Sequence, residues 1–403
     1  MTIKLIKERD VFMNQQASPV QTKDRLHWVD AARGFAIFGI LIVNMLSFSS
    51  PYFTYRGEGL VWNNPEDEVT LAVIDIVFQA SFYSLFSFLF GFGLQLMTDR
   101  LQLKKLEAVP LLTRRLLFLL LFGVIHAFVI WYGDILITYA LVGLLALLFL
   151  KVKERTLIYW AVGLLGGFVG FITFISYLAR TWIAMYGQEP LKPVEPIIAN
   201  YQSNSFTTIW SQNAQDWLFG SGLGLFFLPF LLLPLFLVGM YFARKRWLHH
   251  PMQHKSVLKK LWVYSLILFL VFKLGPYFFG NPLWFEIAQD SIGGLFSALF
   301  YILSITLLGQ TELGAKLMQP FNYVGRMAFT NYIMQSILCV LLFYGIGLGW
   351  YGQTPPLQGV GIAIIIYGLQ MIYSSIWLRK FRYGPLEWLW RSLTYGKMQL
   401  MGK

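Results

Sequence analysis

The chain alternates between long apolar stretches and short polar or basic segments. About ten of the stretches approach the roughly 17–25 residues that a helix needs to cross a hydrocarbon core. Helices that are apolar on every side are at home in a bilayer. The pattern therefore predicts an all-α, polytopic membrane protein whose helices form a bundle around a central cavity. The predicted spans lie near residues 29–50, 71–97, 115–132, 135–150, 157–179, 220–243, 261–279, 291–309, 328–348 and 357–378.

The polar segments between the spans differ in length and in character. A very tight turn at residues 133–134 joins the third and fourth spans, which predicts an antiparallel hairpin. The longest outer loop, about 180–219, contains Gln, Asn, Ser and Trp, and we expect an amphipathic helix there. Residues 1–28 are expected to form a cytoplasmic segment that precedes the transmembrane domain, 29–378. The basic and aromatic tail, 379–403, is typical of an interfacial amphipathic helix on the cytoplasmic side.

The placement of Lys and Arg predicts the orientation of these spans. If both termini are cytoplasmic, all but five of the 32 basic residues fall in segments on the cytoplasmic side. Such an excess is the usual mark of inner loops. The formal charge of +12 then reflects topology and contact with anionic lipids rather than nucleic-acid binding. The five exceptions are Arg56, Arg180 and Lys192 in outer loops and Arg33 and Lys273 inside spans.

Composition agrees with a membrane protein. Hydrophobic residues make up 57% of the chain and charged residues 13%, with a mean hydropathy of +0.57. Soluble domains carry about 25% charged residues, so a soluble fold could not bury this much apolar surface. The single cysteine, Cys339, excludes an intrachain disulfide. No group of Cys or His residues has the spacing of metal ligands, so we expect no metal.

Polar residues inside the first span are the first candidates for function, because such groups are costly at membrane depth. Asp30 and Arg33 are spaced i,i+3 and can pair on one helix face. Arg33 and Asn44 project from the same side, since eleven residues make about three turns. Asp30 can instead be a helix cap, Arg33 a headgroup anchor and Asn44 a hydrogen-bond partner for a neighbouring helix.

His126 is the only histidine within a predicted span. It is the best candidate for a general base, although a buried histidine can also be a simple interhelical hydrogen-bond partner. Asp75 lies at a similar depth on the second span and could orient the imidazole. Asp134, at the hairpin turn, could be catalytic or could cap the next helix. Lys273 and Asp290 also fall in the outer half of the predicted bundle.

At these residues the sequence resembles the YeiB-like family of bacterial multi-pass membrane proteins, whose domain is of unknown function. The resemblance covers nearly the whole chain and implies a bacterial cell-membrane protein. It is carried by Asp30-Ala31-Ala32-Arg33-Gly34-Phe35-Ala36-Ile37-Phe38-Gly39-Ile40 with Val43-Asn44, by His126 … Gly133-Asp134-Ile135-Leu136 … Tyr139-Ala140, by Gly325-Arg326-Met327-Ala328 … Thr330-Asn331-Tyr332, and by Tyr383-Gly384-Pro385-Leu386-Glu387-Trp388-Leu389-Trp390-Arg391.

The first span and the hairpin are also distantly similar to transmembrane acyltransferases such as heparan-alpha-glucosaminide N-acetyltransferase. In these relatives a basic residue is followed, after ten residues, by His or Asn, and here the pattern falls on Arg33 and Asn44. Relatives with Asn use a His just beyond the first span, where this sequence has Tyr55. The similarity therefore implies that His126 has taken over this role or that the activity has changed.

The similarity implies an acyl-CoA-dependent O- or N-acyltransferase with an extracytoplasmic acceptor, a sugar, lipid or envelope component. The phosphates of CoA, the expected cofactor, would lie at a basic inner rim formed by Asp30, Arg33, Arg326 and the pair of Glu387 with Arg391. The histidine in the third span would deprotonate the acceptor. The asparagine of the first span would stabilise the oxyanion. Related acyltransferases form homodimers, so a homodimer is expected as well.

The sequence leaves two other functions open. A transporter for a small or amphipathic molecule would be favoured by broken helices repeated in corresponding halves of the chain. Pro229, Pro234 and the Gly275-Pro276 pair could break helices, but they are not repeated in that way. A non-enzymatic sensor or lipid-binding partner protein would bind neither CoA nor a transported substrate.

Overall fold

The computed structural model describes residues 25–51, 62, 64–187, 192–222 and 224–403. Every regular element in these ranges is a helix, and one isolated bridge pairs Phe381 with Gly402. The all-α class is therefore confirmed. Tyr55 and nearly all of the predicted N-terminal segment lie outside the described residues.

Several helices are long and apolar enough to cross a membrane. Six qualify within the described ranges, and eight if each of two bent pairs is counted as one span. The six are α2 (His27–Ser49), α4 (Pro65–Val73) continued by η2 (Ile74–Phe78) and α5 (Ser81–Leu103), α6 (Ala108–Ile125) continued by η3 (His126–Ile130), α8 (Glu154–Leu178), the stretch Leu283–Leu308 that ends in α15 (Gly294–Leu308), and α18 (Pro356–Lys380).

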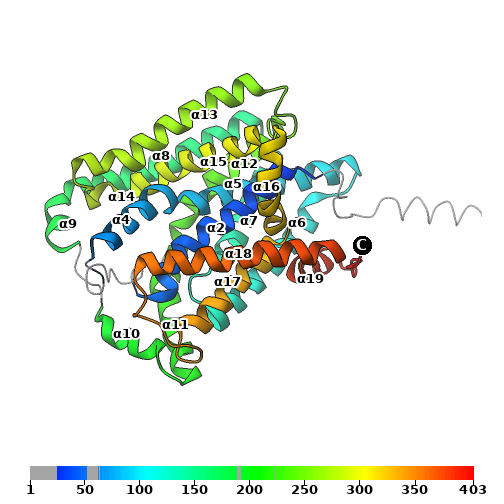
Figure 1. Cartoon of the computed structure of the whole chain (residues 1–403). Coiled ribbons are helices and arrows are strands. Elements are labelled where there is room, and N and C mark those ends of the chain that lie inside the picture. The colour runs from blue at the N-terminus through cyan, green and yellow to red at the C-terminus, as the bar shows by residue number, and fades with distance from the viewer. Residues whose placement is uncertain (1–24, 52–61, 63, 188–191, 223) are drawn as a thin grey trace, which may run out of the picture.

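The two bent pairs each contain a sharp angle between consecutive helices. In the first, the helices of Phe206–Phe226 meet α12 (Leu228–Arg244) at 64°. In the second, α16 (Glu312–Arg326) meets α17 (Ala328–Phe343) at 76°. Figure 1 places α16 and α19 (Pro385–Tyr395) near the end of the bundle where the C-terminus lies. The predicted helix in the tail is therefore present.

Two predicted spans are short or interrupted. The segment near 135–150 forms α7 (Leu136–Ala146) and a 3₁₀ turn, an apolar helix shorter than the other candidates. The segment near 261–279 forms α13 (Lys255–Phe269), the π-helix η7 (Leu270–Leu274) and the 3₁₀ helix η8 (Gly275–Phe279). Pro276 lacks a backbone N–H, so a regular α-helix cannot continue unchanged through this point.

The outer loop forms three short helices rather than one. These are α9 (Arg180–Tyr186), α10 (Val194–Tyr201) and α11 (Phe206–Trp217). Figure 1 shows α10 and α11 together at the end of the bundle opposite the C-terminus. An oxygen of Ser205 accepts a hydrogen bond from the N–H of Thr208 and so caps α11. Helices are thus present where amphipathic structure was predicted.

Glycines allow the closest helix contacts in the bundle. A Cβ atom at Gly91 of α5 would lie 2.1 Å from the carbonyl oxygen of Phe236 in α12, and one at Gly239 of α12 would lie 2.0 Å from the oxygen of Phe88. Gly34 of α2 and Gly325 of α16 meet their partner helices in the same way. Small residues at such crossings let helix backbones approach within a membrane, where packing replaces the hydrophobic effect.

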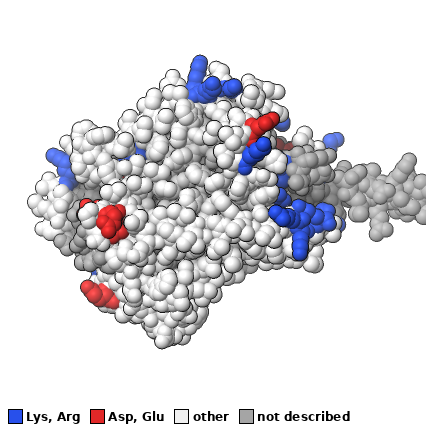
Figure 2. Space-filling model, in the orientation of Figure 1, with Lys and Arg blue, Asp and Glu red and all other residues white. Residues whose placement is uncertain are grey.

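Charged side chains divide between the two ends of the molecule. In Figure 2 most visible Lys and Arg side chains gather toward the end that carries the C-terminus, and Asp and Glu are prominent at the other end. Arg244, at the end of α12, is tied into the basic end by hydrogen bonds to the carbonyl oxygens of Phe149, Leu150 and Val152. The structure thus brings together the segments that the sequence predicts to share one side of the membrane.

Candidate functional site

His126 lies in a buried hydrogen-bond chain with a carboxylate and a hydroxyl. Its Nδ1 is 2.8 Å from Oδ2 of Asp134, and its Nε2 is 2.8 Å from Oγ of Ser336. The other oxygen of Asp134 accepts a hydrogen bond of 2.8 Å from the N–H of Ile137 at the start of α7. The side chains of His126 and Asp134 are fully buried, and Ser336 is 1% exposed. The site is a serine–histidine–aspartate arrangement enclosed within the bundle.

The predicted pairing of His126 with Asp75 is therefore wrong, because Asp134 takes that place. Asp134 caps the next helix, since one of its oxygens accepts from the N-terminal turn of α7. The other oxygen contacts the imidazole, and a catalytic role for this carboxylate stays a prediction. As an acceptor, the carboxylate holds the proton of a neutral imidazole on Nδ1 and leaves Nε2 free to accept. This is the tautomer that a general base requires.

The π-helix η3 shapes the backbone at the histidine. It follows α6 directly, and the N–H of Trp131 closes it by bonding the carbonyl oxygen of His126. Single π-turns are often found at functional sites. Helix α11 covers the turn, because Asn213 donates a 2.7 Å hydrogen bond to the carbonyl oxygen of Ala127 and Trp210 donates to that of Phe128. The outer-loop helices thus satisfy carbonyls that the helix end leaves without internal partners.

We expect Asn213→Ala to lower the free energy of unfolding by about 1–3 kcal/mol, because the carbonyl oxygen of Ala127 would lose its partner in a buried place. Asn213 is only 3% exposed. Thermal unfolding in detergent would measure the change. Gln215→Ala is a matched control on the same helix, since this side chain is exposed and its bond to Ser211 is long, at 3.4 Å. Equal melting temperatures for the two variants would contradict this function of α11.

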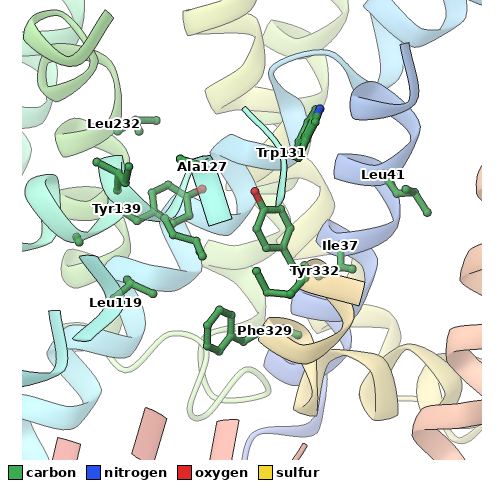
Figure 3. Packing of buried hydrophobic residues seen from close by; sticks show 14 of the residues in the cluster. Ile37, Leu41, Leu119, Ala127, Trp131, Tyr139, Leu232, Phe329 and Tyr332 are labelled. Carbon is green, nitrogen blue, oxygen red and sulfur yellow. The ribbon is translucent and has the colours of Figure 1, made fainter. Parts of the chain in front are cut away.

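Aromatic side chains enclose the histidine. Tyr332 lies with its ring centroid 5.1 Å from that of the imidazole, and the ring of Trp131 stacks on Phe48 at 3.8 Å. Figure 3 shows Trp131, Tyr332 and Phe329 one after another along the interior, with Leu41 of α2 to one side of them. Packed rings therefore border the imidazole, with the centroid of Tyr332 at 5.1 Å and that of Trp131 at 6.3 Å.

Helix α17 presents polar side chains toward two neighbours. Ser336 faces the histidine, whereas Gln335 donates a 2.8 Å hydrogen bond to Gln370 of α18. Gln370 in turn donates to the carbonyl oxygen of Asn331, and Asn331 donates to Ser374. These bonds fix the rotation of α17 about its axis, and with it the direction in which the serine points.

The other predicted residues of the outer half lie elsewhere. Asp75 accepts hydrogen bonds from Tyr277 and Gln289, and Lys273 lies 3.6 Å from it. Lys273 is fully buried and donates a 2.5 Å bond to Asp290. The three charged residues come from three π-helical segments, η2, η7 and η10 (Gln289–Gly293), and Tyr277 comes from the 3₁₀ helix η8. The structure thus shows a second polar cluster, separate from the histidine site.

Asn44 has no hydrogen bond to His126 among the described residues, since both imidazole nitrogens are engaged by other groups. The asparagine lies one turn before Phe48, which stacks on Trp131 beside the imidazole. It is partly exposed within α2. Its predicted role in stabilising an oxyanion stays a prediction.

An arginine cluster forms at the basic end of the bundle. Asp30 binds Arg33 at 2.8 Å, as the i,i+3 spacing predicts, and also Arg25 at 2.9 Å. Arg326 interacts electrostatically with this group. Its Nε atom is buried and makes no hydrogen bond within the described part of the chain. A buried donor of this kind is a group that an anionic partner could satisfy.

Two further arginines complete the arginine cluster, which we define as Arg25, Arg33, Arg115, Arg326 and Arg391. Arg115 stacks over the ring of Trp390 at 3.6 Å. Burial and, after it, the positive charge of Arg25 lower the pKa of Arg391 from its ordinary value. Five guanidinium groups are thus close together, and two carboxylates, Asp30 and Glu387, interact with them within the described part of the chain. This excess of positive charge favours binding of an anion.

Glu387 is one of those carboxylates, but it does not form the predicted pair with Arg391. Its Oε1 accepts hydrogen bonds from the N–H groups of Phe329 and Thr330 at 2.7 and 3.0 Å, and its Oε2 accepts one from the Thr330 hydroxyl at 2.6 Å. Burial raises the pKa of this carboxyl group. Glu387 therefore caps the N-terminus of α17, and its role in binding the cofactor stays a prediction.

Sequence reasoning missed Ser336, because a serine in an apolar helix has no local pattern that marks it. It lies 210 positions from the histidine along the chain. It also missed Arg25 and Arg115, which were interpreted only as basic residues of cytoplasmic segments. The contact of Arg115 with Trp390 depends on how α6 and α19 pack. Arg25 contacts Asp30 from the segment just before α2.

Comparison with known proteins gives one family match. The family model described as "Protein of unknown function (DUF418)" matches residues 242–397. The chain is 39% identical to the uncharacterized protein YxaH of Bacillus subtilis (strain 168), over 96% of this chain and 98% of that protein. It is 30% identical to an uncharacterized 39.9 kDa protein in the amylase 3′ region of Bacillus acidopullulyticus, over 94% and 96%. It is 28% identical to the uncharacterized protein YeiB of Escherichia coli (strain K12), over 91% and 95%. No solved structure matches the chain.

Proposed function

Since the chain belongs to the DUF418 family of multi-pass membrane proteins, we propose that it is a membrane-bound acyltransferase. It would move an acyl group from cytoplasmic acyl-CoA to a hydroxyl or amine acceptor on the extracytoplasmic side. The observation that carries this proposal is the buried arrangement of His126 with Asp134 on one nitrogen and Ser336 on the other. Many enzymes that transfer acyl groups use a histidine base that a carboxylate orients and that contacts a hydroxyl group.

The arginine cluster supports acyl-CoA as the donor. Guanidinium groups bind phosphates with forked, charge-assisted hydrogen bonds, and CoA carries several phosphate groups. Arg326 and Arg391 of the cluster belong to α16 and α19, which lie toward the end that carries the C-terminus (Figure 1). A cytoplasmic ligand would arrive at this end in the predicted orientation. Asp30 holds Arg25 and Arg33 in place. Its predicted role near the cofactor is thus one of positioning.

The distance between His126 and the arginine cluster suits an acyl donor with a long, thin chain. Arg115 and His126 lie on α6 and its π-helical continuation, about 16 Å apart along the axis at 1.5 Å per residue. The pantetheine arm of CoA is an extended chain of comparable length. Tyr332 packs on the imidazole, and Phe329 packs on Trp390 beside Arg115. The arm would therefore displace at least one of these rings to bring its thioester to the histidine.

We further propose ten spans, with both termini in the cytoplasm of a bacterial cell. Two of these spans, α7 and α13 with its irregular continuation, lie alongside the longer helices α6 and α15. The gathering of basic side chains at one end supports this orientation. The closed interior would open into the predicted central cavity when substrates bind.

Acyl-CoA is expected to raise the melting temperature of the purified protein. A ligand at 100 times its Kd stabilises the folded state by about 2.7 kcal/mol. Arg391→Gln should weaken binding about tenfold, because one charge-assisted contact to phosphate is lost. Lys259→Gln is the matched control, since this exposed basic residue lies on α13 outside the arginine cluster. CoA, acetyl-CoA, longer acyl-CoAs and ATP would be compared.

The second polar cluster supports an alternative function, transport of a small or amphipathic molecule. Lys273, Asp75 and Asp290 are ionisable groups at membrane depth, and such groups often lie on substrate or ion pathways. If no CoA species shifts the melting temperature, transport becomes the leading function. Flux into proteoliposomes without acyl-CoA would then support it.

A further inference from the structure

We propose that Ser336 is a nucleophile that carries the acyl group as a covalent ester, so that the transfer proceeds in two half-reactions. This inference rests on the proposed acyl-CoA-dependent function. It goes beyond that function, because a base acting directly on the acceptor would need no intermediate.

The position of the hydroxyl supports a chemical role. Ser336 Oγ lies 2.8 Å from His126 Nε2 but 3.5 Å from the carbonyl oxygen of Tyr332, four residues earlier. A serine within a helix commonly bonds that carbonyl, and here the shorter contact is with the imidazole. The Ser336 hydroxyl is therefore hydrogen-bonded to Nε2, the one imidazole nitrogen that could deprotonate an acceptor.

The enclosure of the site favours a relay. Tyr332 lies against the imidazole, and Phe329 of the same helix packs on Trp390, the ring that stacks with Arg115. Trp131 also lies beside the imidazole, and through Tyr132 it connects to Tyr201 of α10. Donor and acceptor would approach from opposite ends, and each must reach the same nitrogen. A group fixed between the two approaches can receive the acyl chain from one side and pass it to the other, without both substrates being present together.

Each half-reaction forms one bond to the acyl carbon and breaks another, and the histidine carries the proton. In the first, Nε2 of His126 takes the hydroxyl proton, Oγ of Ser336 forms a bond to the thioester carbonyl carbon, and the carbon–sulfur bond breaks. The CoA thiolate leaves and takes the proton from the imidazolium. In the second, the histidine takes a proton from the acceptor hydroxyl or amine, which attacks the serine ester. The serine oxygen leaves and recovers the proton.

The test is exchange of isotopically labelled CoA into acyl-CoA by the full-length protein in detergent, without any acceptor. Only a covalent intermediate allows this exchange. We expect exchange in the wild type, a loss of about 10³-fold or more in Ser336→Ala, and near-normal exchange in Cys339→Ser. Cys339 is the matched control, because it is buried one turn further along α17 and could carry a thioester instead. Melting temperatures would show that each variant is folded.

A second variant tests the chemistry of the bond. Ser336→Cys should form a thioester that neutral hydroxylamine removes, whereas the ester in the wild type should resist it. An acyl adduct on Ser336 in the intact-protein mass supports the proposal. Acyl transfer without CoA exchange, or unchanged transfer in Ser336→Ala, overturns the covalent step and leaves the acyltransferase function standing. Absence of both acyl-CoA binding and transfer overturns the function and the inference together.

Discussion

His126→Ala is expected to reduce acyl transfer by about 10³–10⁴-fold while acyl-CoA still raises the melting temperature. General-base catalysis contributes 10²–10⁴-fold in enzymes, and removal of one member of a serine–histidine–aspartate unit disables the whole unit. Binding should survive because the arginine cluster lies about 16 Å away along α6. Transfer would be followed with labelled acyl-CoA and a panel of hydroxyl and amine acceptors.

Asp134→Asn provides the sharper comparison. The asparagine oxygen can still accept the bond from the N–H of Ile137 that Asp134 accepts now. Its amide nitrogen would then face Nδ1 of His126 as a donor, which moves the imidazole proton to Nε2 and removes the base. Activity should therefore fall nearly as far as in the histidine variant, with little loss of stability. Unchanged turnover in both variants would contradict the assignment of His126 and Asp134 as catalytic residues.

Glu387→Ala is expected to cost about 3 kcal/mol of the free energy of unfolding. The carboxylate accepts three hydrogen bonds at the start of α17. Its removal would leave the N–H groups of Phe329 and Thr330 buried without partners. It would also remove a negative charge from the positive end of the helix dipole. Chemical or thermal unfolding in mixed micelles would measure the loss.

Glu387→Gln is the matched variant for this prediction. Its amide oxygen can still accept from the two backbone N–H groups, so we expect a loss of only about 1 kcal/mol. If instead Glu387 bound a ligand, both variants would keep the melting temperature of the unliganded protein and would differ from the wild type only when acyl-CoA is present. That result would restore the pairing with Arg391 that the sequence suggested.

Local spacing predicted part of the site. Asp30 and Arg33 are one turn apart on the same helix, so their contact needs no knowledge of tertiary packing. His126 and Asp134 both belong to the predicted hairpin, and their contact closes over the π-helix that ends α6. No sequence pattern marks a π-turn. The two residues were therefore recognised as candidates without being recognised as partners.

Similar depth in the membrane did not predict correctly which side chains contact one another. Asp75 and His126 were placed at similar depth, but depth fixes only one coordinate, and the two helices turn these side chains toward different neighbours. Ser336 depends on the packing of α17 against the hairpin, which the hydrophobic pattern does not encode. The same pattern did predict the helical class and most spans, because length and apolar character alone identify a membrane helix.

The glycine contacts also decide which parts of the bundle can move. At Gly34 and Gly325, and at Gly91 and Gly239, backbone lies against backbone, so no side chain can change rotamer to let these helices slide. We therefore expect α2 with α16, and α5 with α12, to behave as two rigid blocks. Irregular backbone lies elsewhere, at the 76° bend by Met327 between α16 and α17 and at the π-turn η3. If the interior opens for substrates, we expect α17 and the hairpin to move about these two points while both blocks keep their shape.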